Sequence, residues 1–395
     1  MNFIAPDRIE TESLRIRSAA RAVSRLAAER AEALDRTGGF PVRDVVDCHE
    51  AGLLAAPLPV ALGGSGLDAP AMAPVLRDVL ADLGRGNLAL GRLYEGHVNA
   101  LSLILRYATE PVLRRLVDDI HAGHLFGVWN TQPRTGGLDL DPHGTGLLAG
   151  AKSFASGAGS VTRPLVTARR PDGRQQMLVV SLEPGTRADL SSWCAHGMRA
   201  STSGVLDFTG LPVSAQAAVG EADDYFREPY FSGGAWRFTA VQLGGIEAVF
   251  DSLRAHLVAT GRGDDPHQAA RLGEAAIAVE TARLFVGRAA DLAGDPDADP
   301  ERAIAYVNLT RLAVERAGLD VIERAQRSVG LAGFLQPHPL ERQIRDLATY
   351  LRQPGPDRAL THAAAHVLAA TRTADALWRE PGADDPADVR PERAA

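Results

Sequence analysis

Apolar residues recur every three to four positions through the first third of the chain, which is the spacing of helices that bury one face. Six apolar side chains fall on one stripe within Met72–Leu83, with Asp68 placed before them as a possible cap. Similar patterns predict helices over Glu10–Asp35 and His97–Tyr107. The chain is therefore expected to begin with a helical domain.

The pattern changes after residue 125, where apolar runs shorten and Gly, Pro and Asp interrupt them. β-Branched residues become frequent, and several short segments read as strands separated by turns. Short strands at this spacing predict a small antiparallel β-barrel or sandwich. The expected strands are Leu147–Ser156, Leu165–Arg169, Met177–Leu182 and Val205–Phe208.

The last part of the chain returns to helical periodicity. Long helices are expected over Trp236–Thr260, Gln268–Leu292 and Glu301–Val329. The last of these carries two apolar seams, which require neighbours on two sides, as in an antiparallel bundle. The order predicts an α+β protein with an N-terminal helical domain, a middle small antiparallel β-barrel and a C-terminal four-helix bundle. The expected boundaries are residues 1–125, 126–222 and 223–378, with a disordered tail over 379–395.

Composition narrows the function classes. The 395 residues are 45% apolar and 23% charged, as in globular proteins, and no stretch is long and apolar enough to span a membrane. A net charge of -7 argues against a nucleic-acid partner. The two cysteines, Cys48 and Cys194, and the absence of an apolar leader favour a cytoplasmic protein.

Lysine and histidine chemistry has few candidate sites. Lys152 is the only lysine, so chemistry based on a Schiff base or a phosphate-loop lysine would have to use it. We expect this residue on an exposed hairpin. His362 and His366 stand four residues apart, but no acidic third ligand is evident, so no metal site is predicted.

Four motifs follow one another along the chain. Phe126–Pro133 reads Phe-Gly-Val-Trp-Asn-Thr-Gln-Pro, and Leu148–Gly157 carries Lys152, Phe154 and Ser156. The other two are Gly197–Ser203, which begins Gly-Met-Arg, and Gln326–Gly333, followed by Arg342-x-x-Arg345-Asp346. In this order and spacing, over residues 8–370, they resemble the acyl-CoA dehydrogenase superfamily of flavoproteins.

The resemblance implies FAD as cofactor. Thr131 and Ser156 would contact the isoalloxazine ring, and Trp129 and Phe154 would wall it, which suits a ring that needs a flat apolar surface with donors at its edge. Three further residues, Arg262, Gln326 and Gly330, would hold the diphosphate and adenine, partly across the interface of a homodimer or homotetramer. The family's Phe-Gly pair is missing after Arg262, so an exposed interhelical loop remains the alternative reading.

The catalytic base is the point where the sequence departs from the family. Pro354 stands where the family commonly has its glutamate, and the second known position, within residues 234–243, holds no carboxylate. Glu95, paired with His97, is the leading substitute base; the alternative is a surface turn and a core histidine. Asp357 is expected to cap a helix, and Glu247 to lie on a solvent-facing surface.

Three functions remain open. The first is an oxidoreductase that dehydrogenates an acyl thioester, on CoA or an acyl carrier protein, with hydride transfer to the flavin and an unassigned electron acceptor. The second is a flavin-dependent monooxygenase of the same fold, which needs no base for an α-proton. The third is an inactive family member with a binding role.

Overall fold

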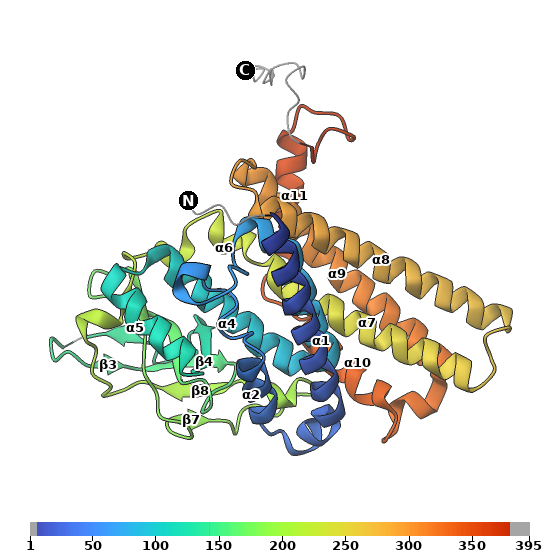
Figure 1. Ribbon diagram of the computed structural model, residues 1–395, viewed down its shortest axis with the longest axis horizontal. Coiled ribbons are helices and arrows are strands. Elements are labelled where there is room, and N and C mark those ends of the chain that lie inside the picture. Colours follow the sequence, from blue (N-terminus) through green and yellow to red (C-terminus); the bar gives the residue numbers. More distant parts are fainter. Residues whose placement is uncertain (1–5, 142, 380–395) are drawn as a thin grey trace.

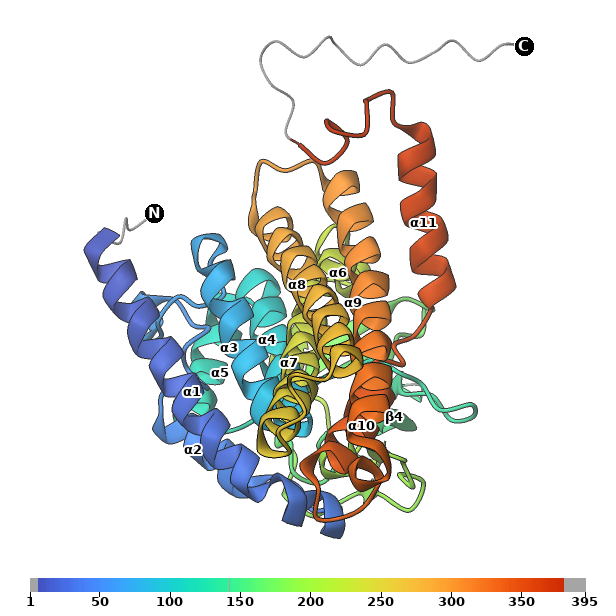
Figure 2. The ribbon, with the colours of Figure 1, turned by 90° about the vertical axis from the view of Figure 1, so that its right-hand side faces the viewer.

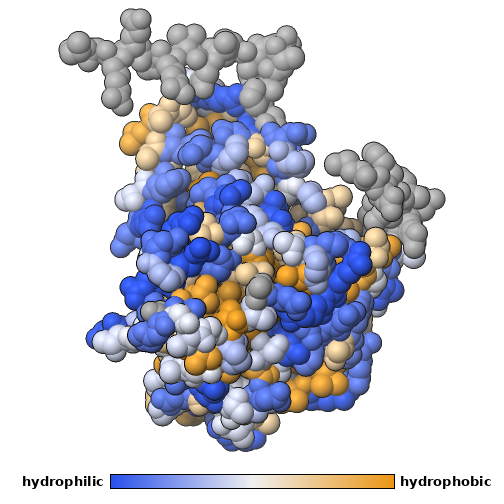
Figure 3. Space-filling model, turned by 90° about the vertical axis from the view of Figure 1, so that its left-hand side faces the viewer, coloured by the Kyte–Doolittle hydropathy of each residue, from blue (hydrophilic) through white to orange (hydrophobic). Residues whose placement is uncertain are grey.

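The computed structural model describes residues 6–141 and 143–379, so nearly all of the tail expected over 379–395 lies outside the described residues. The β region lies on one side and the long C-terminal helices on the other, with N-terminal helices between them (Figure 1). The face that carries the β region is largely polar, with separate apolar patches (Figure 3). Within the described residues, no helix has the length and apolar character needed to cross a membrane.

Helices form both ends of the chain, as the periodicity predicts. The N-terminal helices are α1 (Pro6–Thr37), α2 (Val42–Glu50), α3 (Ala73–Gly86), α4 (Leu88–Tyr107) and α5 (Glu110–His121). The C-terminal helices are α6 (Tyr230–Gly233), α7 (Trp236–Ala259), α8 (Pro266–Gly294), α9 (Pro300–Val329), α10 (Pro339–Tyr350) and α11 (Pro356–Ala369).

Helix α4 begins nine residues before the predicted start at His97, because the Asn87 side chain caps it by accepting from the Ala89 N–H at 3.0 Å. Asp68 does not cap α3 as expected. Its carboxylate instead accepts from the Ser102 hydroxyl at 2.9 Å, on α4, so it connects a loop to a neighbouring helix.

The expected four-helix bundle is observed as three long helices, α7, α8 and α9, that pack on one another. Helix α11 lies along α9 and α10 packs against α7, while α3 from the N-terminal domain covers α7 from the other side (Figure 2). The C-terminal helices and the N-terminal helices therefore share one core.

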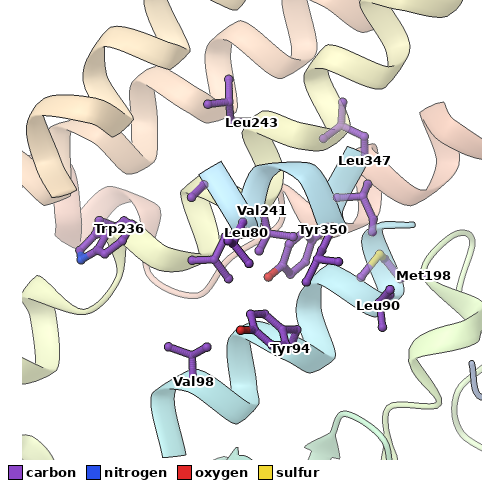
Figure 4. Close-up of a cluster of buried hydrophobic side chains, with 14 of the residues drawn as sticks. Leu80, Leu90, Tyr94, Val98, Met198, Trp236, Val241, Leu243, Leu347 and Tyr350 are labelled. Carbon is purple, nitrogen blue, oxygen red and sulfur yellow. The ribbon is translucent and has the colours of Figure 1, made fainter. Parts of the chain in front are cut away.

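Two glycines permit the close crossing of α3 and α7. A Cβ at Gly84 would lie 2.4 Å from the Val241 carbonyl oxygen, and one at Gly244 would lie 1.9 Å from the Ala81 oxygen. Only hydrogen fits at both positions, so the stripe predicted over Met72–Leu83 packs directly onto α7. Figure 4 shows Leu80 of this stripe beside Val241.

No closed β-barrel is found among the described residues, whose strands form two separate sheets. One follows the order β3-β2-β5-β6-β9 with β1 beside β5, and the other follows β4-β8-β7. The β1–β5 pair is parallel, so the region is not wholly antiparallel either. The strands are β1 (Phe126–Trp129), β2 (Asp139–Leu140), β3 (Leu148–Ala149), β4 (Ala151–Ala155), β5 (Arg163–Arg169), β6 (Gln175–Val179), β7 (Ala188–Asp189), β8 (Gly204–Asp207) and β9 (Ala218–Val219).

The strand predicted over Leu147–Ser156 is divided at Gly150. This residue has φ +103, and a Cβ there would lie 2.3 Å from the Gly137 oxygen. The chain changes direction at this point, so that β3 joins the first sheet and β4 the second. A single glycine thus converts one expected strand into a crossing between sheets.

Lys152 is not on an exposed hairpin, as expected, but fully buried. Its ammonium group donates to the Asn130 carbonyl at 3.0 Å and to the Thr167 hydroxyl at 2.9 Å. Burial lowers the pKa of this lysine to about 7. The only lysine therefore links β4 to the strands beneath it.

Arg345 joins the three parts of the chain. Its guanidinium binds both carboxylate oxygens of Asp35 on α1, at 3.1 and 2.6 Å, and donates to the His196 carbonyl of the β region at 3.0 Å. Glu341 on α10 accepts from the same group. The neighbouring Asp346 accepts from the Met198 N–H at 2.6 Å.

We expect Arg345→Met to lower the free energy of unfolding by about 3–5 kcal/mol, because Asp35 would stay buried without its counter-ion. Urea denaturation followed by circular dichroism measures the change. The double variant Arg345→Met/Asp35→Leu should recover part of the loss, and Arg358→Gln on an exposed face should have little effect. A loss below about 1 kcal/mol in the single variant would contradict the assigned role.

Stability should rise between pH 7 and 8.5 because of Lys152. In this window the folded lysine releases its proton while the unfolded lysine, with a pKa near 10.5, retains it. The slope approaches about 1.4 kcal/mol per pH unit. Lys152→Met should remove this slope in urea titrations at several pH values. An unchanged slope in the variant would show that other groups produce it.

Candidate functional site

An exposed aromatic ring marks the outer surface of the second sheet. Phe154 on β4 is 69% exposed and has φ +51, in the left-handed region that bulky residues rarely adopt. The register of β4 against β8 is irregular at this point, between Lys152 and Ala155. Such strain persists only where the surroundings impose it, and it is frequent at ligand sites.

Three serine hydroxyls form a chain that ends two residues after Phe154, at Ser156. The Ser203 hydroxyl donates to the Ser156 hydroxyl at 3.0 Å and lies 2.9 Å from that of Ser201. Thr131 is exposed at the end of β1, and its carbonyl accepts from the Ser153 N–H at 3.0 Å. The structure thus brings Thr131, Phe154 and Ser156 together on adjacent segments, a surface we call the platform.

Trp129 does not form an exposed wall for a flavin ring, as the sequence resemblance implied. Its side chain is buried at 2% exposure, and its indole N–H donates to the Ser156 carbonyl at 3.0 Å. The ring packs edge-on against Phe208. Trp129 therefore supports the platform from beneath, and Phe154 offers the exposed aromatic face.

A line of polar side chains follows one face of α4, which is otherwise apolar. Arg92, Glu95, Asn99, Ser102 and Arg106 are spaced three or four residues apart and so share this face, which we call the α4 polar face. The helix lies close to β1, where a Cβ at Gly96 would be 3.8 Å from the Gly127 Cα. The α4 polar face therefore lies on a helix that contacts β1, the strand that precedes Thr131 of the platform.

Both oxygens of Glu95 are engaged. One accepts from the Arg92 guanidinium and the other from the Asn99 amide. Burial alone would lower the pKa of Arg92, but the adjacent Glu95 carboxylate raises it, so the arginine remains charged. Glu95 is 3% exposed inside α4, which corrects the alternative that placed it on a surface turn.

His97 is a core histidine, as the alternative reading proposed. One ring nitrogen lies 2.8 Å from the Leu54 carbonyl and the other accepts from the Phe126 N–H at 3.1 Å. Burial lowers its pKa to about 4. The histidine is neutral at physiological pH and does not contact Glu95 through a recorded hydrogen bond, so the two do not form the expected pair.

Arg237 on α7 extends the α4 polar face. It lies 3.2 Å from the Asn99 amide oxygen, 3.2 Å from the Ser102 hydroxyl and 3.7 Å from the Asp68 carboxylate. Its buried Nε has no partner among the described residues. One donor of a buried guanidinium is therefore available to a further acceptor.

Two tyrosines complete the surroundings of Arg92 and Glu95. Burial raises the pKa of Tyr225 to about 12 and raises that of Tyr350 further. The Tyr350 hydroxyl is buried and has no partner in the described part of the chain. Figure 4 shows this side chain, from α10, beside Tyr94 and Val241. Both phenols are neutral hydrogen-bond donors at physiological pH.

The other proposed carboxylates are not placed to act as a base. Asp357 does not cap α11; Gly355 occupies the cap position, and Asp357 is exposed on the first turn. Glu247 is mostly buried rather than solvent-facing, and it pairs with Arg283 at 2.8 Å. In the loop before α11, the Pro354 carbonyl accepts from Arg311 at 2.6 Å.

The three residues expected at a diphosphate lie together, but not near the platform. Arg262 donates to the Ser328 carbonyl at 3.1 Å, and the Gly330 N–H donates to the Gln326 carbonyl at the end of α9. When the Gln268 amide is oriented so that its nitrogen donates to the Ser328 hydroxyl, its oxygen accepts from Arg262 at 2.5 Å. Figure 1 places the α7–α8 connection at the end of the long helices away from the β region.

The sequence reading missed most of the α4 polar face. The available signal was the three-to-four spacing of polar residues in an apolar helix, from Arg92 to Arg106. Arg237 and Tyr350 belong to other helices, so only the tertiary structure brings them there. Within residues 6–141 and 143–379, no group of three or more His, Cys, Asp or Glu side chains is arranged to hold a metal ion.

Comparison with known proteins gives matches over both helical domains. Residues 10–124 match the family described as "Acyl-CoA dehydrogenase, N-terminal domain", and residues 238–352 match "Acyl-CoA dehydrogenase, C-terminal domain". L-Evernosamine nitrososynthase of a Micromonospora species is 27% identical over 354 residues, covering 82% of each chain. A short-chain-specific acyl-CoA dehydrogenase of Clostridium acetobutylicum is 25% identical over 79% of this chain and 86% of its own.

A solved structure agrees with the fold. The dibenzothiophene monooxygenase TdsC from Paenibacillus sp. A11-2, solved with FMN and indole, superimposes with a TM-score of 0.79 at 18% identity, covering 90% of this chain and 97% of its own. The matched domains occupy more than half of the sequence and flank a β region, as the four motifs imply. The chain belongs to the acyl-CoA dehydrogenase superfamily.

Proposed function

We propose that this protein is a flavin-dependent monooxygenase built on the acyl-CoA dehydrogenase fold. The observation that carries the proposal is that, among the described residues, neither position considered for the base supplies an unengaged carboxylate. Pro354 stands at the usual position, and both oxygens of Glu95 are bound by Arg92 and Asn99. Abstraction of an α-proton requires an unoccupied base within hydrogen-bond reach of the substrate.

The relatives support the same choice. Both a nitrososynthase and a dehydrogenase resemble this chain in sequence, and the structure of a dibenzothiophene monooxygenase resembles its fold. Dehydrogenation of an acyl thioester, the first reading of the sequence, therefore becomes the second candidate. It retains the support of the dehydrogenase relative but lacks an assigned base.

The platform fits a flavin. Phe154 offers an exposed aromatic face, and Thr131 and Ser156, on the adjoining segments, would supply hydroxyl donors for a heteroaromatic ring. A reduced flavin held there would supply the electrons that activate molecular oxygen, with one oxygen atom transferred to the substrate and the other released as water. Trp129 holds the Ser156 carbonyl, so the hydroxyl beside the ring keeps its position.

We propose FMN in place of the FAD expected from the sequence. TdsC was solved with FMN, and the segment after Arg262 lacks the family's Phe-Gly pair. Arg262 is also occupied by the Ser328 carbonyl and the Gln268 amide. These bonds leave the arginine less available to a diphosphate.

We also propose a homo-oligomer, as the sequence reading expected. Arg262, Gln326 and Gly330 lie at one end of the long helices, away from the platform of the same chain (Figure 1). Because Arg262 is engaged by Ser328 and Gln268, Gln326 and the Gly330 segment are the groups that would approach a flavin, and they would do so only on a second copy. This arrangement agrees with a cofactor site completed across a subunit interface.

The substrate of the proposed reaction is a polar molecule. Arg92, Asn99 and Arg237 line the approach along α4 with charged and amide groups, whereas a fatty acyl chain needs apolar walls. The neutral phenols of Tyr225 and Tyr350 hold their protons throughout the physiological range.

Phe154→Asn should weaken FMN binding at least about tenfold, because the aromatic face is lost while asparagine tolerates the left-handed backbone. Titration of FMN and FAD, followed by quenching of flavin fluorescence, measures both affinities. Phe226→Asn, which removes another exposed ring, is the matched control and should leave binding unchanged. Equal losses in the two variants would argue against the platform as the flavin site.

Oxygen transfer separates the two candidate reactions. With chemically reduced FMN, isotopically labelled oxygen and an amino sugar as the polar probe, the substrate class named for a nitrososynthase relative, we expect labelled product by mass spectrometry. Anaerobic addition of a panel of acyl-CoAs to the oxidised holoprotein should leave the flavin spectrum unchanged. Bleaching by an acyl-CoA in the wild type, lost in Glu95→Gln, would instead establish dehydrogenation with Glu95 as its base.

A further inference from the structure

We propose that a groove between the end of α1 and the loop before β8 binds a small organic anion with a flat apolar body. The groove has a volume of about 460 Å³, within the range of small-molecule sites. Arg36 and Asp35 contribute one wall, and Trp193, Arg199 and Thr202 contribute the other. None of these residues was assigned to the flavin or the substrate above.

The charge of the groove is positive. Asp35, its only carboxylate, is neutralised by the two-point contact with Arg345, at 3.1 and 2.6 Å. Arg199 donates its Nε to the Ala195 carbonyl at 3.3 Å, and no carboxylate of the described residues lies within ion-pair distance of it. Arg36 has only a distant partner, Glu32 at 3.9 Å, and both side chains are more than half exposed. Guanidinium groups in this state bind carboxylates and phosphates.

Thr202 provides an observation that does not depend on the charges of the groove. Thr202 is 4% exposed, and its Oγ1 has no hydrogen-bond partner within the described part of the chain. Its backbone has φ +42, which is rare for a β-branched residue. Thr202 therefore lines the groove with a strained backbone and a hydroxyl that no group in the described structure satisfies.

An apolar surface accompanies the charges. The Trp193 indole N–H is used within the loop, since it donates to the Met198 carbonyl at 3.2 Å. The indole therefore presents no free donor to the groove, and its ring supplies apolar contact together with Leu190, which is 42% exposed. This combination favours an anion that carries an aromatic ring over a bare inorganic ion.

The two walls are fixed to each other before any ligand binds. Arg345 holds Asp35 on one wall and the His196 carbonyl, at 3.0 Å, in the loop that forms the other. Asp346 fixes the same loop by accepting from the Met198 N–H at 2.6 Å. A preorganised site binds with a smaller loss of conformational entropy.

The full-length protein without added flavin provides a test that does not depend on the proposed function. Isothermal titration with phenyl phosphate and with benzoate distinguishes a phosphate from a carboxylate ligand, and benzamide serves as the neutral control. We expect saturable binding of at least one anion and none of benzamide. Arg199→Gln should weaken that binding at least about tenfold, whereas Arg358→Gln, an exposed arginine on α11, should leave it unchanged.

Arg36→Gln provides a second variant, away from the strained loop, should Arg199→Gln fail to fold by near-ultraviolet circular dichroism. A weakened affinity in either folded variant supports the site. Absence of saturable binding of both anions, equal binding of benzamide, or an affinity that neither variant changes would overturn the proposal. None of these results depends on whether the protein binds FMN or transfers oxygen.

Discussion

The buried guanidinium of Arg345 is the interaction on which the arrangement of the three parts depends. Asp35 comes from the first helix, His196 from the β region and Glu341 from the C-terminal helices, and all three meet at one side chain. A charge at this depth is tolerated only when its hydrogen bonds are satisfied, so each partner has a fixed place. Because the loop from His196 to Ser203 follows directly, the same interaction positions the serine hydroxyls that bond to Ser156. The geometry of the candidate cofactor site is thus a consequence of domain packing.

The polar face of α4 shows why the fold alone does not define the reaction. In this chain a helix that packs on the β region carries a line of charged and amide side chains, and Glu95 is fully engaged within it. A carboxylate held by an arginine and an amide orders its neighbours, and both of its oxygens already accept a hydrogen bond from the protein. The absence of glutamate at Pro354 gains weight because the substitutes considered, Glu95, Asp357 and Glu247, are each engaged or exposed elsewhere in the described part of the chain. The superfamily is shown by the sequence, whereas the reaction rests on these few side chains.

The helical domains were predictable from sequence because periodicity reports which face of a helix is buried. The stripe at Met72–Leu83 and the long C-terminal helices agree with α3, α7, α8 and α9 to within a few residues. The β region was less predictable, since the division at Gly150 depends on the approach of Gly137, which is distant in sequence. The burial of Lys152 was not predicted for a similar reason. The alternation of side chains along β4 does not indicate which face of the strand is covered by the rest of the protein. Among the candidate site residues, the motifs pointed to Phe154 and Ser156, but they could not show that Trp129 lies buried behind Ser156.

Burial of Lys152 has a practical consequence, because the chain holds no other lysine. Its ammonium group is fully enclosed and bonded to Asn130 and Thr167. A reagent that acylates side-chain amines would find its sole target inside the protein, and reaction there would require β4 to separate from its neighbours. The rate of acylation at this residue would therefore report how often the β region opens locally while the helices remain folded.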